Sequence, residues 1–277
     1  MGVTRFPGAT TRQQDFTSSG TWTAPSGVYS AEFFVVGAGG AGGGVSLSSA
    51  AHYGAGGGGG GGAVKKVSLA VTPGTSYTIT IGAKGSGSAG ASGGTGGFSE
   101  VLNGATSLIK CGGGQGGGGV TSSVLVYATL STTIATGGGF STGGTTTSIQ
   151  LGGGGGGAAA GSYTGENNQG FGGEGSFGKQ SNAATNTTRV VTGFQGIEGY
   201  GAGGSGGSIN TSTLYNTSAG ATNAGIAPNI TTTGANAGGA AVANTGCGGA
   251  GSAVHTSITS VAGGNGSDGL VRVVYFA

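Results

Sequence analysis

The sequence is poor in charge, since its 277 residues include only nine Lys or Arg and seven Asp or Glu. Two long stretches, Cys111 to Gly165 and Gly199 to Ser267, contain none of these four residue types. A surface that binds nucleic acid needs clustered Lys and Arg to release counterions from the phosphates. We therefore expect no nucleic-acid partner.

Proline, cysteine and long apolar runs are also scarce. With four prolines and no sustained Gly-X-Y period, the chain is not collagen. The two cysteines, Cys111 and Cys247, are too few for a disulfide scaffold. They form either one bridge or, the interpretation that we favour, two small buried residues. No apolar run is long enough to span a bilayer and the first 15 residues lack the core of a signal peptide, so we expect no membrane insertion.

Residues that carry chemistry are equally few. The sequence Gly37–Gly42 fits GxGxxG, but neither the helix nor the acidic residue of a dinucleotide site follows it. Gly203–Gly207 fits GxSxG, as any Ser in a glycine run would. His52 and His255 have no partners at ligand or triad spacing, and we expect both at the surface, near a possible receptor contact. We predict no enzymatic activity, no metal and no cofactor.

Glycine is what the chain has in excess, with 74 residues, of which only four precede Gly37. A flexible, disordered chain is the alternative to consider. Low charge, 35% hydrophobic residues and clear strands at both ends favour order instead. Runs of seven to ten residues in a polyproline II helix, at about 3.1 Å per residue, span about 20 to 30 Å. Without Cβ atoms such helices can approach closely and pair their backbones, which predicts a polyglycine II bundle.

The stretch from Val28 to Gly44 is central to the fold prediction, because an apolar strand there leads directly into a glycine run. Its first half alternates, with Tyr29, Ala31, Phe33 and Val35 expected on one buried face. A preceding strand is expected over Asp15–Ala24, with Trp22 in the core.

Further strands are predicted on both sides of the glycine-rich region. Ala63–Val71 and Ser76–Ile81 flank a type II turn at Thr72–Thr75, and we expect them to pair as a hairpin. Phe98–Leu102 and Ser107–Cys111 form a second expected hairpin around Asn103 and Gly104. Leu270–Phe276 is expected to close the same sheet. Phe98 and Phe276 are expected in the core.

These elements predict an all-β protein with essentially no α-helix. A small β-sandwich, closed by the N- and C-terminal strands, carries an inserted bundle of polyglycine II helices and loops. The expected division is a tail or attachment segment (1–14), a sandwich with the first glycine runs (15–111 and 268–277), and a glycine-rich region with projecting loops (112–267).

Tyrosines in or beside the glycine segments are the candidate binding residues, because exposed Tyr offers a large rigid face with a polar tip. The alternative is that such aromatics plug the rim of the glycine lattice. The candidates for receptor contact are Tyr53, Tyr127, Tyr163, Tyr200 and Tyr215.

Three segments carry a family resemblance: FTSSGTWTAPSGVYSAEFFVVGAGGAGGG, VSLAVTPGTSYTITIGAKG and GGNGSDGLVRVVYF. In this order they resemble the glycine-rich domain of bacteriophage tail-tip and tail-fibre proteins. The long glycine region also resembles polyglycine II adhesins at the tips of some tail fibres. The resemblance implies a virion protein of a tail fibre or tail tip, with a host cell-surface protein or glycan and other tail proteins as partners. It further implies a homotrimer or attachment to a trimeric fibre.

Two other functions remain open at this point. A virion fibre or appendage subunit could be purely structural, with the projecting loops of residues 112–267 packed against neighbouring chains. An ice-binding protein is the third hypothesis, because polyglycine II bundles offer flat faces and the chain has Thr-rich stretches at Thr145–Thr147 and Thr231–Thr233.

Overall fold

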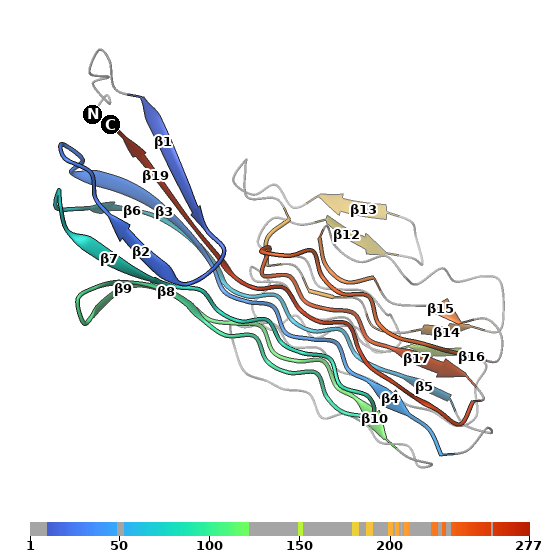
Figure 1. Ribbon diagram of the computed structural model, residues 1–277. Helices are drawn as coiled ribbons and strands as arrows, with labels where there is room; N and C mark the ends of the chain where they lie inside the picture. The colour runs from blue at the N-terminus through green and yellow to red at the C-terminus, as the bar shows by residue number, and fades with distance from the viewer. Residues whose placement is uncertain are drawn as a thin grey trace.

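The described part of the protein is all-β and comprises a sandwich, which contains the strands nearest to both chain ends, and a bundle of extended glycine segments (Figure 1). The described residues contain nineteen strands and no helix. The computed structural model describes residues 10–48, 53–121, 149–151, 179–182, 187–190, 199–201, 203–204, 206, 208–210, 223–226, 229–230, 234–255 and 257–277.

The sandwich consists of two four-stranded antiparallel sheets. The first sheet contains, in spatial order, β1 (Thr11–Phe16), β19 (Leu270–Phe276), β3 (Ser30–Val36) and β6 (Val64–Ala70). The second contains β2 (Gly20–Thr23), β7 (Ser76–Thr80), β8 (Ser99–Asn103) and β9 (Thr106–Cys111). As predicted, the C-terminal strand β19 closes a sheet with the N-terminal strands, between β1 and β3.

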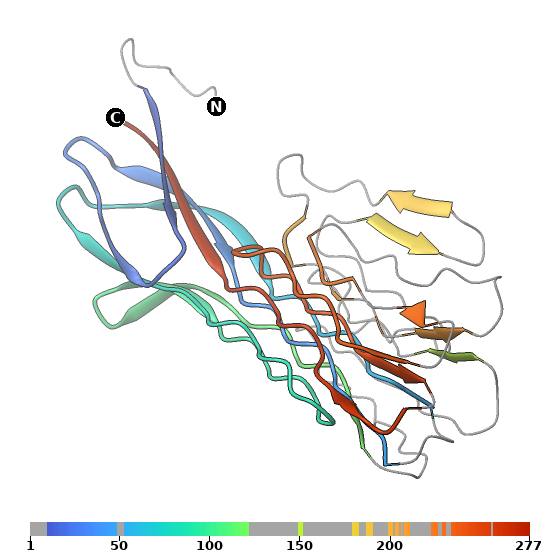
Figure 2. The ribbon, with the colours of Figure 1, turned by 45° about the vertical axis from the view of Figure 1, so that its right-hand side comes forward.

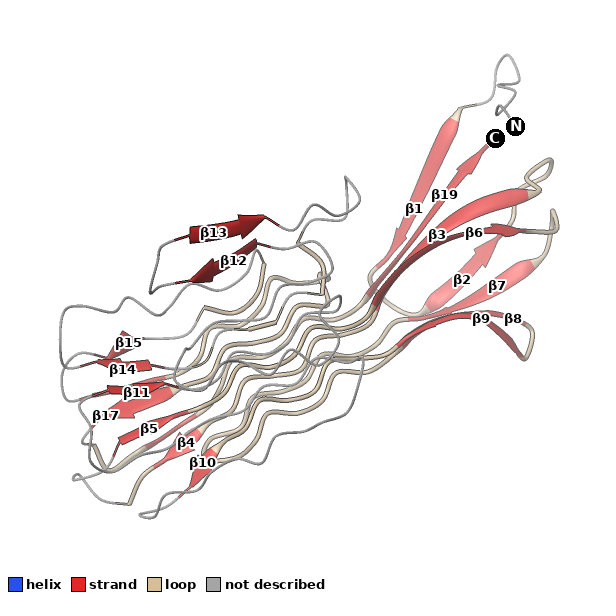
Figure 3. Ribbon diagram, turned by 180° about the vertical axis from the view of Figure 1, so that it is seen from behind, coloured by secondary structure: helices blue, strands red, loops and turns tan. Residues whose placement is uncertain are grey.

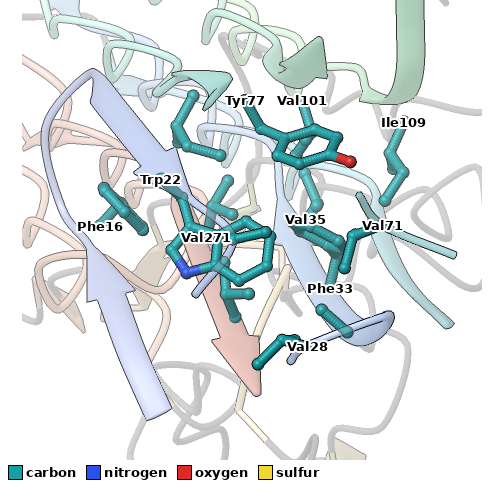
Figure 4. Packing of buried hydrophobic residues seen from close by; sticks show 14 of the residues in the cluster. Phe16, Trp22, Val28, Phe33, Val35, Val71, Tyr77, Val101, Ile109 and Val271 are labelled. Atoms are coloured by element: carbon teal, nitrogen blue, oxygen red, sulfur yellow. The ribbon is translucent and has the colours of Figure 1, made fainter. Parts of the chain in front are cut away.

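Alternate side chains of both sheets fill the space between them and form the main core (Figure 4). Trp22 of β2 is buried and packs edge-on against Phe33 of β3, with ring centroids 5.5 Å apart. Tyr77 of β7 lies beside the same indole, 5.6 Å away. Such pairs add to the free energy of apolar burial, so the predicted core position of Trp22 is confirmed.

The expected strand over Asp15–Ala24 is two strands, because the chain reverses at residues 17–19 and enters the other sheet as β2. Thr11 to Gln14, expected in the tail, pair with β19. In β3 the alternation holds for Ala31, Phe33 and Val35, whereas Tyr29 precedes the strand and is exposed.

The first hairpin prediction is wrong in its pairing although the turn is right. Gly74 has a φ of 79°, and the amide of Thr75 donates to the carbonyl of Thr72 (3.0 Å). Yet β6 pairs with β3 and β7 pairs with β2 and β8, so the turn connects the two layers of the sandwich. The second hairpin, β8 with β9 around Gly104, is confirmed.

Two aromatic residues expected in the core lie at the surface. Phe98 precedes β8 and stays 42% exposed, with the Lys110 ammonium 3.7 Å from its ring centroid. Phe276, at the end of β19, is also exposed. Both lie on the outer faces of their sheets, because Val101 of β8 and Val273 of β19, three residues away, face the core.

Six strands of the sandwich run on without a break into extended glycine segments (Figures 1 and 3). Extended strand and polyproline II conformations are neighbours in φ/ψ space, so no turn is needed. We call the segments together the glycine bundle; they comprise residues 37–44 after β3, 56–63 before β6, 82–88 after β7, 91–97 before β8, 112–119 after β9, 246–252, and 262–269 before β19.

Segment 37–44 is the centre of the glycine bundle, and its hydrogen bonds have a period of three residues. Successive amides donate to three different neighbours: Gly37, Gly40 and Gly43 to segment 56–63, Ala38, Ala41 and Gly44 to segment 91–97, and Gly39 and Gly42 to segment 262–269. Three further segments donate to its carbonyl oxygens, namely 82–88, 112–119 and 246–252. A helix with three residues per turn places successive residues in this way. The bundle is therefore a lattice of polyglycine II helices, as predicted.

Glycine is required where the central segment faces its neighbours. A methyl group on Gly40 would overlap the carbonyl oxygen of Gln115, and one on Gly43 would overlap that of Gly118. The third register carries Ala38 and Ala41 instead, whose side chains are fully buried. Side chains separate the two sheets of the sandwich, whereas in the bundle the same chains hydrogen-bond directly to each other. Figure 2 shows the strands of the two sheets continuing into the bundle.

The expected division groups the first glycine runs with the sandwich in residues 15–111. Segments 37–44, 56–63 and 82–97 are these first runs, and they form the middle of the bundle. Further glycine-rich stretches of the sequence, at residues 137–144, 152–157 and 170–178, lie outside the described residues, and so do both Thr-rich stretches.

Short strands are found where the glycine segments end. One sheet has β4 (Val45–Ser46) between β10 (Val120–Thr121) and β18 (Ser260–Val261), and another has β17 (Ala253–His255) between β16 (Gly234–Asn236) and β5 (Tyr53–Ala55). The remaining strands are β11 (Ile149–Leu151), β14 (Ser208–Asn210) and β15 (Asn229–Ile230) in one sheet and the pair β12 (Lys179–Asn182) and β13 (Thr187–Val190).

Candidate binding surface

The surface most distant from the chain ends is the far end of the glycine bundle (Figures 1 and 3). We call it the tip and define it as β4, β5, β10, β16, β17, β18 and the turn of residues 257–259. At the other end of the molecule Thr10 and Ala277 exchange two backbone hydrogen bonds of 2.8 and 3.1 Å. The sandwich thus holds the chain ends, and the bundle separates them from the tip.

A small apolar cluster fixes the tip to the end of the bundle. Val45, Leu47, Val120 and Val254 are buried against each other. The hydroxyl groups of Ser46 and Ser260 are hydrogen-bonded across β4 and β18 (2.6 Å). These contacts begin at the residues where each glycine segment ends. At the tip, side-chain packing therefore takes over from the backbone hydrogen bonds of the bundle.

The tip carries no formal charge among its described residues, since none of its strands contains Asp, Glu, Lys or Arg. The ion pairs of the described chain lie in the sandwich or at its junction with the bundle: Glu32 with Lys66, Lys84 with Asp268, Glu100 with Lys110, and Asp15 with Arg272. Charge is therefore segregated from the tip in this part of the chain.

One large apolar residue is exposed in the tip. Ile258 is 68% exposed in the turn that connects β17 to β18. The sequence analysis did not identify it, although the pattern carries a signal: an isolated Ile in the polar stretch Thr256–Ser260 between two apolar positions.

Two of the five candidate tyrosines, Tyr53 and Tyr200, lie among the described residues, and they lie in different parts of the molecule. Tyr53 lies in β5 at the tip, opposite His255 of β17. Tyr200 lies at the sandwich end, partly buried, with its ring 5.0 Å from that of Phe34 and nearly perpendicular to it. Tyr200 thus packs on the outer face of the first sheet, where that sheet meets the bundle. Its role in receptor contact, like that of Tyr53, stays a prediction.

Tyr127, Tyr163 and Tyr215 lie outside the described residues, and so does His52. His255 was expected at the surface, but it is only 8% exposed. The correction follows from its place in β17, the central strand of its three-stranded sheet.

Both cysteines are buried and form no disulfide, as the favoured interpretation holds. The thiol of Cys111 donates to the carbonyl oxygen of Val35 (3.3 Å), and burial raises its pKa to about 11. A thiol that stays protonated at neutral pH is a poor nucleophile.

The described residues also contain no group of three potential metal ligands. No helix among them is long and apolar enough to cross a membrane.

A two-layer β-sandwich whose strands continue into a threefold glycine lattice defines a glycine-rich, all-β class of protein. The glycine-rich domain family matches residues 13–276, and the chain belongs to this family. A comparison with curated proteins finds no match.

Proposed function

We propose that this chain is a bacteriophage virion protein of the tail fibre or tail tip that binds a receptor on the host cell surface. The observation that supports the proposal best is the position of the tip, at the opposite end of the bundle from the chain ends (Figure 1). A fibre that adheres to a cell needs this arrangement, because one end must join the particle while the other stays free.

The glycine bundle suits the role of a spacer. Its central segment is hydrogen-bonded to six surrounding segments, and loops on a rigid scaffold are the usual carriers of binding residues. In this proposal the sandwich end contacts other tail proteins, as one chain of a homotrimer or of a trimeric fibre, and the protein catalyses no reaction.

Binding of the purified, labelled protein to candidate host strains tests the proposal. We expect saturable binding, and we expect an excess of unlabelled protein to block adsorption of a phage that carries it. A folded sample that binds no strain and blocks no adsorption would exclude the receptor-binding role.

One observation supports a second candidate, a structural subunit without a receptor. Ile226 and Val242 lie on the flank of the bundle and are 61% and 54% exposed. Hydrogen bonds place them on neighbouring segments, since Gly239 donates to the carbonyl of Ile226 and Val242 to that of Asn223. A purely structural subunit would bury this flank against adjacent chains, and its oligomers would dissociate when Val242→Glu is introduced while cell binding is absent throughout.

A further inference from the structure

We propose that Asn103 is a site of spontaneous deamidation, at which the chain converts its own Asn to a mixture of Asp and isoaspartate. We also propose that the glycine bundle protects the second Asn–Gly pair of the sequence, Asn265–Gly266, from the same reaction. This inference is independent of the proposed function, because it concerns the covalent chemistry of the chain itself.

The reaction requires that the backbone amide after the Asn is free to attack. Its nitrogen forms a bond with the Cγ atom of the Asn side chain, the bond between Cγ and Nδ2 breaks, and the proton of the attacking amide leaves with the side-chain nitrogen as ammonia. Water then opens the resulting succinimide ring at either carbonyl group, which gives Asp or isoaspartate. A following glycine favours the attack, because it has no side chain in the way and its backbone is conformationally permissive.

The sequence contains two Asn–Gly pairs, Asn103–Gly104 and Asn265–Gly266, and the structure describes both. Both asparagines are exposed, so the accessibility of the side chain does not distinguish them. The two pairs differ in the hydrogen bonding and packing of the glycine that supplies the attacking nitrogen.

The first pair lies in the turn between β8 and β9. Gly104 is the first of the two turn residues and has a φ of 57°, which is typical of a type II′ hairpin turn. Neither its amide nor the side chain of Asn103 forms a hydrogen bond with another described residue. Beyond its two chain neighbours, no atom lies within 4 Å of the position that a Cβ of Gly104 would take. The attacking nitrogen is therefore free, and the ring has room to form.

The second pair is held in the bundle on both sides of the reaction. The amide of Gly266 donates to the carbonyl oxygen of Gly85 (3.0 Å), and Oδ1 of Asn265 accepts a hydrogen bond from the amide of Gly87 (2.9 Å). Gly266 is also buried, and a methyl group on it would overlap the carbonyl oxygen of Gly39. Asn265 must therefore break these hydrogen bonds before it can cyclise, which limits the reaction to local opening of the lattice.

The modified turn lies at the end of the sandwich away from the bundle (Figure 1). Asp at position 103 would keep the backbone and add a negative charge. Isoaspartate would in addition route the main chain through the side-chain carbon and so lengthen the turn between β8 and β9. Deamidation thus alters the charge and the turn at this end of the molecule and leaves the bundle unchanged.

Peptide mapping by mass spectrometry tests the inference on the whole chain, incubated in mildly alkaline buffer that contains water labelled with heavy oxygen. We expect the peptide with Asn103 to give two products, Asp and isoaspartate, each with one labelled oxygen. We expect the peptide with Asn265 to convert at least about tenfold more slowly while the protein is folded. In denaturant the two rates should become similar, because both peptides contain Asn–Gly.

A matched pair of variants provides the control. In Asn103→Gln the side chain would have to form a larger and less favourable ring, so we expect the fast phase of ammonia release from the folded protein to disappear. In Asn265→Gln we expect the same phase to be unchanged.

Two outcomes would overturn the inference. Equal rates at the two sites of the folded protein would show that the bundle does not protect Asn265. Conversion of Asn103 in denaturant but not in the folded protein would show that the β8–β9 turn prevents the attack. Neither outcome bears on cell binding, so the proposed function is tested separately.

Discussion

At the scale of single residues, the glycine bundle depends on hydrogen atoms that occupy the place of side chains. A side chain on Gly40 would clash with the backbone of Gln115, and one on Gly42 would clash with the backbone of Ala250. In both cases the clash is with backbone atoms, which cannot rotate away as the end of a flexible side chain could. The lattice thus tolerates methyl groups in one register of the central segment, at Ala38 and Ala41, and excludes them from the other two.

We predict that Gly40→Ala lowers the free energy of unfolding by about 3 kcal/mol or more, because the new methyl group would force two hydrogen-bonded helices apart. Gly20→Ala is the matched control: the added atom would meet only the ring of Phe16, at an ordinary 3.7 Å. Urea titration followed by tryptophan fluorescence measures both. Equal stability of the two variants would contradict the close contact in the bundle.

The buried thiol of Cys111 makes a prediction about alkaline pH. Its pKa rises from 9.0 to about 11 on folding because burial disfavours the thiolate. The folded state therefore holds the proton more tightly, and the stabilisation from the thiol is complete below pH 9.0 and is lost as the pH rises through 11.

The difference in unfolding free energy between the unchanged protein and Cys111→Ala, measured across this range, isolates the thiol from the titrating Lys and Tyr residues. We expect it to be constant up to pH 9.0 and to fall above it. A difference that stays constant up to pH 11 would show that the pKa is not raised.

The sequence indicates which residues are apolar but not which of them the opposite sheet covers. Trp22 and Phe33 lie in the middle of strands, so alternation was sufficient to place them in the core. Phe98 and Phe276 alternate with Val101 and Val273, which face the core, so both aromatic rings lie on the outer faces of the sandwich. His255 was misplaced for a related reason, since β17 is too short to show an alternating pattern.

At the scale of elements, the pair of β1 and β19 joins the two ends of the chain. Arg272 of β19 donates two hydrogen bonds of 2.8 Å to the two carboxylate oxygens of Asp15 in β1. These bonds are the main cause that lowers the pKa of Asp15 below 3.8. A bidentate Arg–carboxylate pair is stronger than an ordinary surface ion pair, although partial exposure of both side chains to solvent screens it.

We predict that Asp15→Asn costs about 1 kcal/mol of stability at neutral pH. Because the folded pKa of Asp15 is lowered, the stabilisation is present above 3.8 and is lost as the pH falls through the folded value. Denaturant titrations of both proteins at neutral and acidic pH measure it. The two stabilities should converge in acid, and a gap that persists there would show that the ion pair is not its source.

Local sequence predicted turns better than it predicted partners. The residues Thr72–Thr75 contain the Pro and Gly of a type II turn, and the turn is present. Whether the two strands beside such a turn pair with each other depends on strands that are distant in the sequence. Here β6 pairs with β3 and β7 pairs with β2 instead. The hairpin of β8 and β9 was predicted correctly because no other strand takes the place of its partner.

At the scale of the whole molecule, order extends from the sandwich into a region without conventional secondary structure. The amides of residues 39–43 all donate to backbone oxygens at 2.8 to 2.9 Å, and all five residues are buried. The two sheets merge here into one lattice, so the glycine bundle and the sandwich share the same continuous chains.

We predict that the amides of residues 39–43 exchange with solvent as slowly as those of β3, because opening one of them disrupts several neighbouring helices. Hydrogen exchange followed by mass spectrometry or NMR measures the protection, with the exposed turn of Ser26 and Gly27 as the unprotected reference. Exchange of residues 39–43 at the rate of that turn would mean that the lattice does not persist in solution.

Composition and periodicity were sufficient to predict the two parts of the molecule and the helix type of the bundle. They could not locate the boundary, because it lies across the ends of six strands rather than at one point in the chain. Among the candidate binding residues, Tyr53 and Tyr200 were grouped because both are tyrosines beside glycine segments. The fold places them at opposite ends of the glycine bundle. The position of Ile258 depends on the β17–β18 turn and emerges only in three dimensions.

The threefold repeat of the bundle sets the step by which such a protein can change its length in evolution. Adding three residues to an outer segment lengthens it by about 9 Å and leaves every side chain on its original face. Adding one or two residues instead rotates all later positions by one or two thirds of a turn and drives side chains into the backbones beside them. Viable variants in family members should therefore differ in these segments by multiples of three residues, with other lengths confined to the loops.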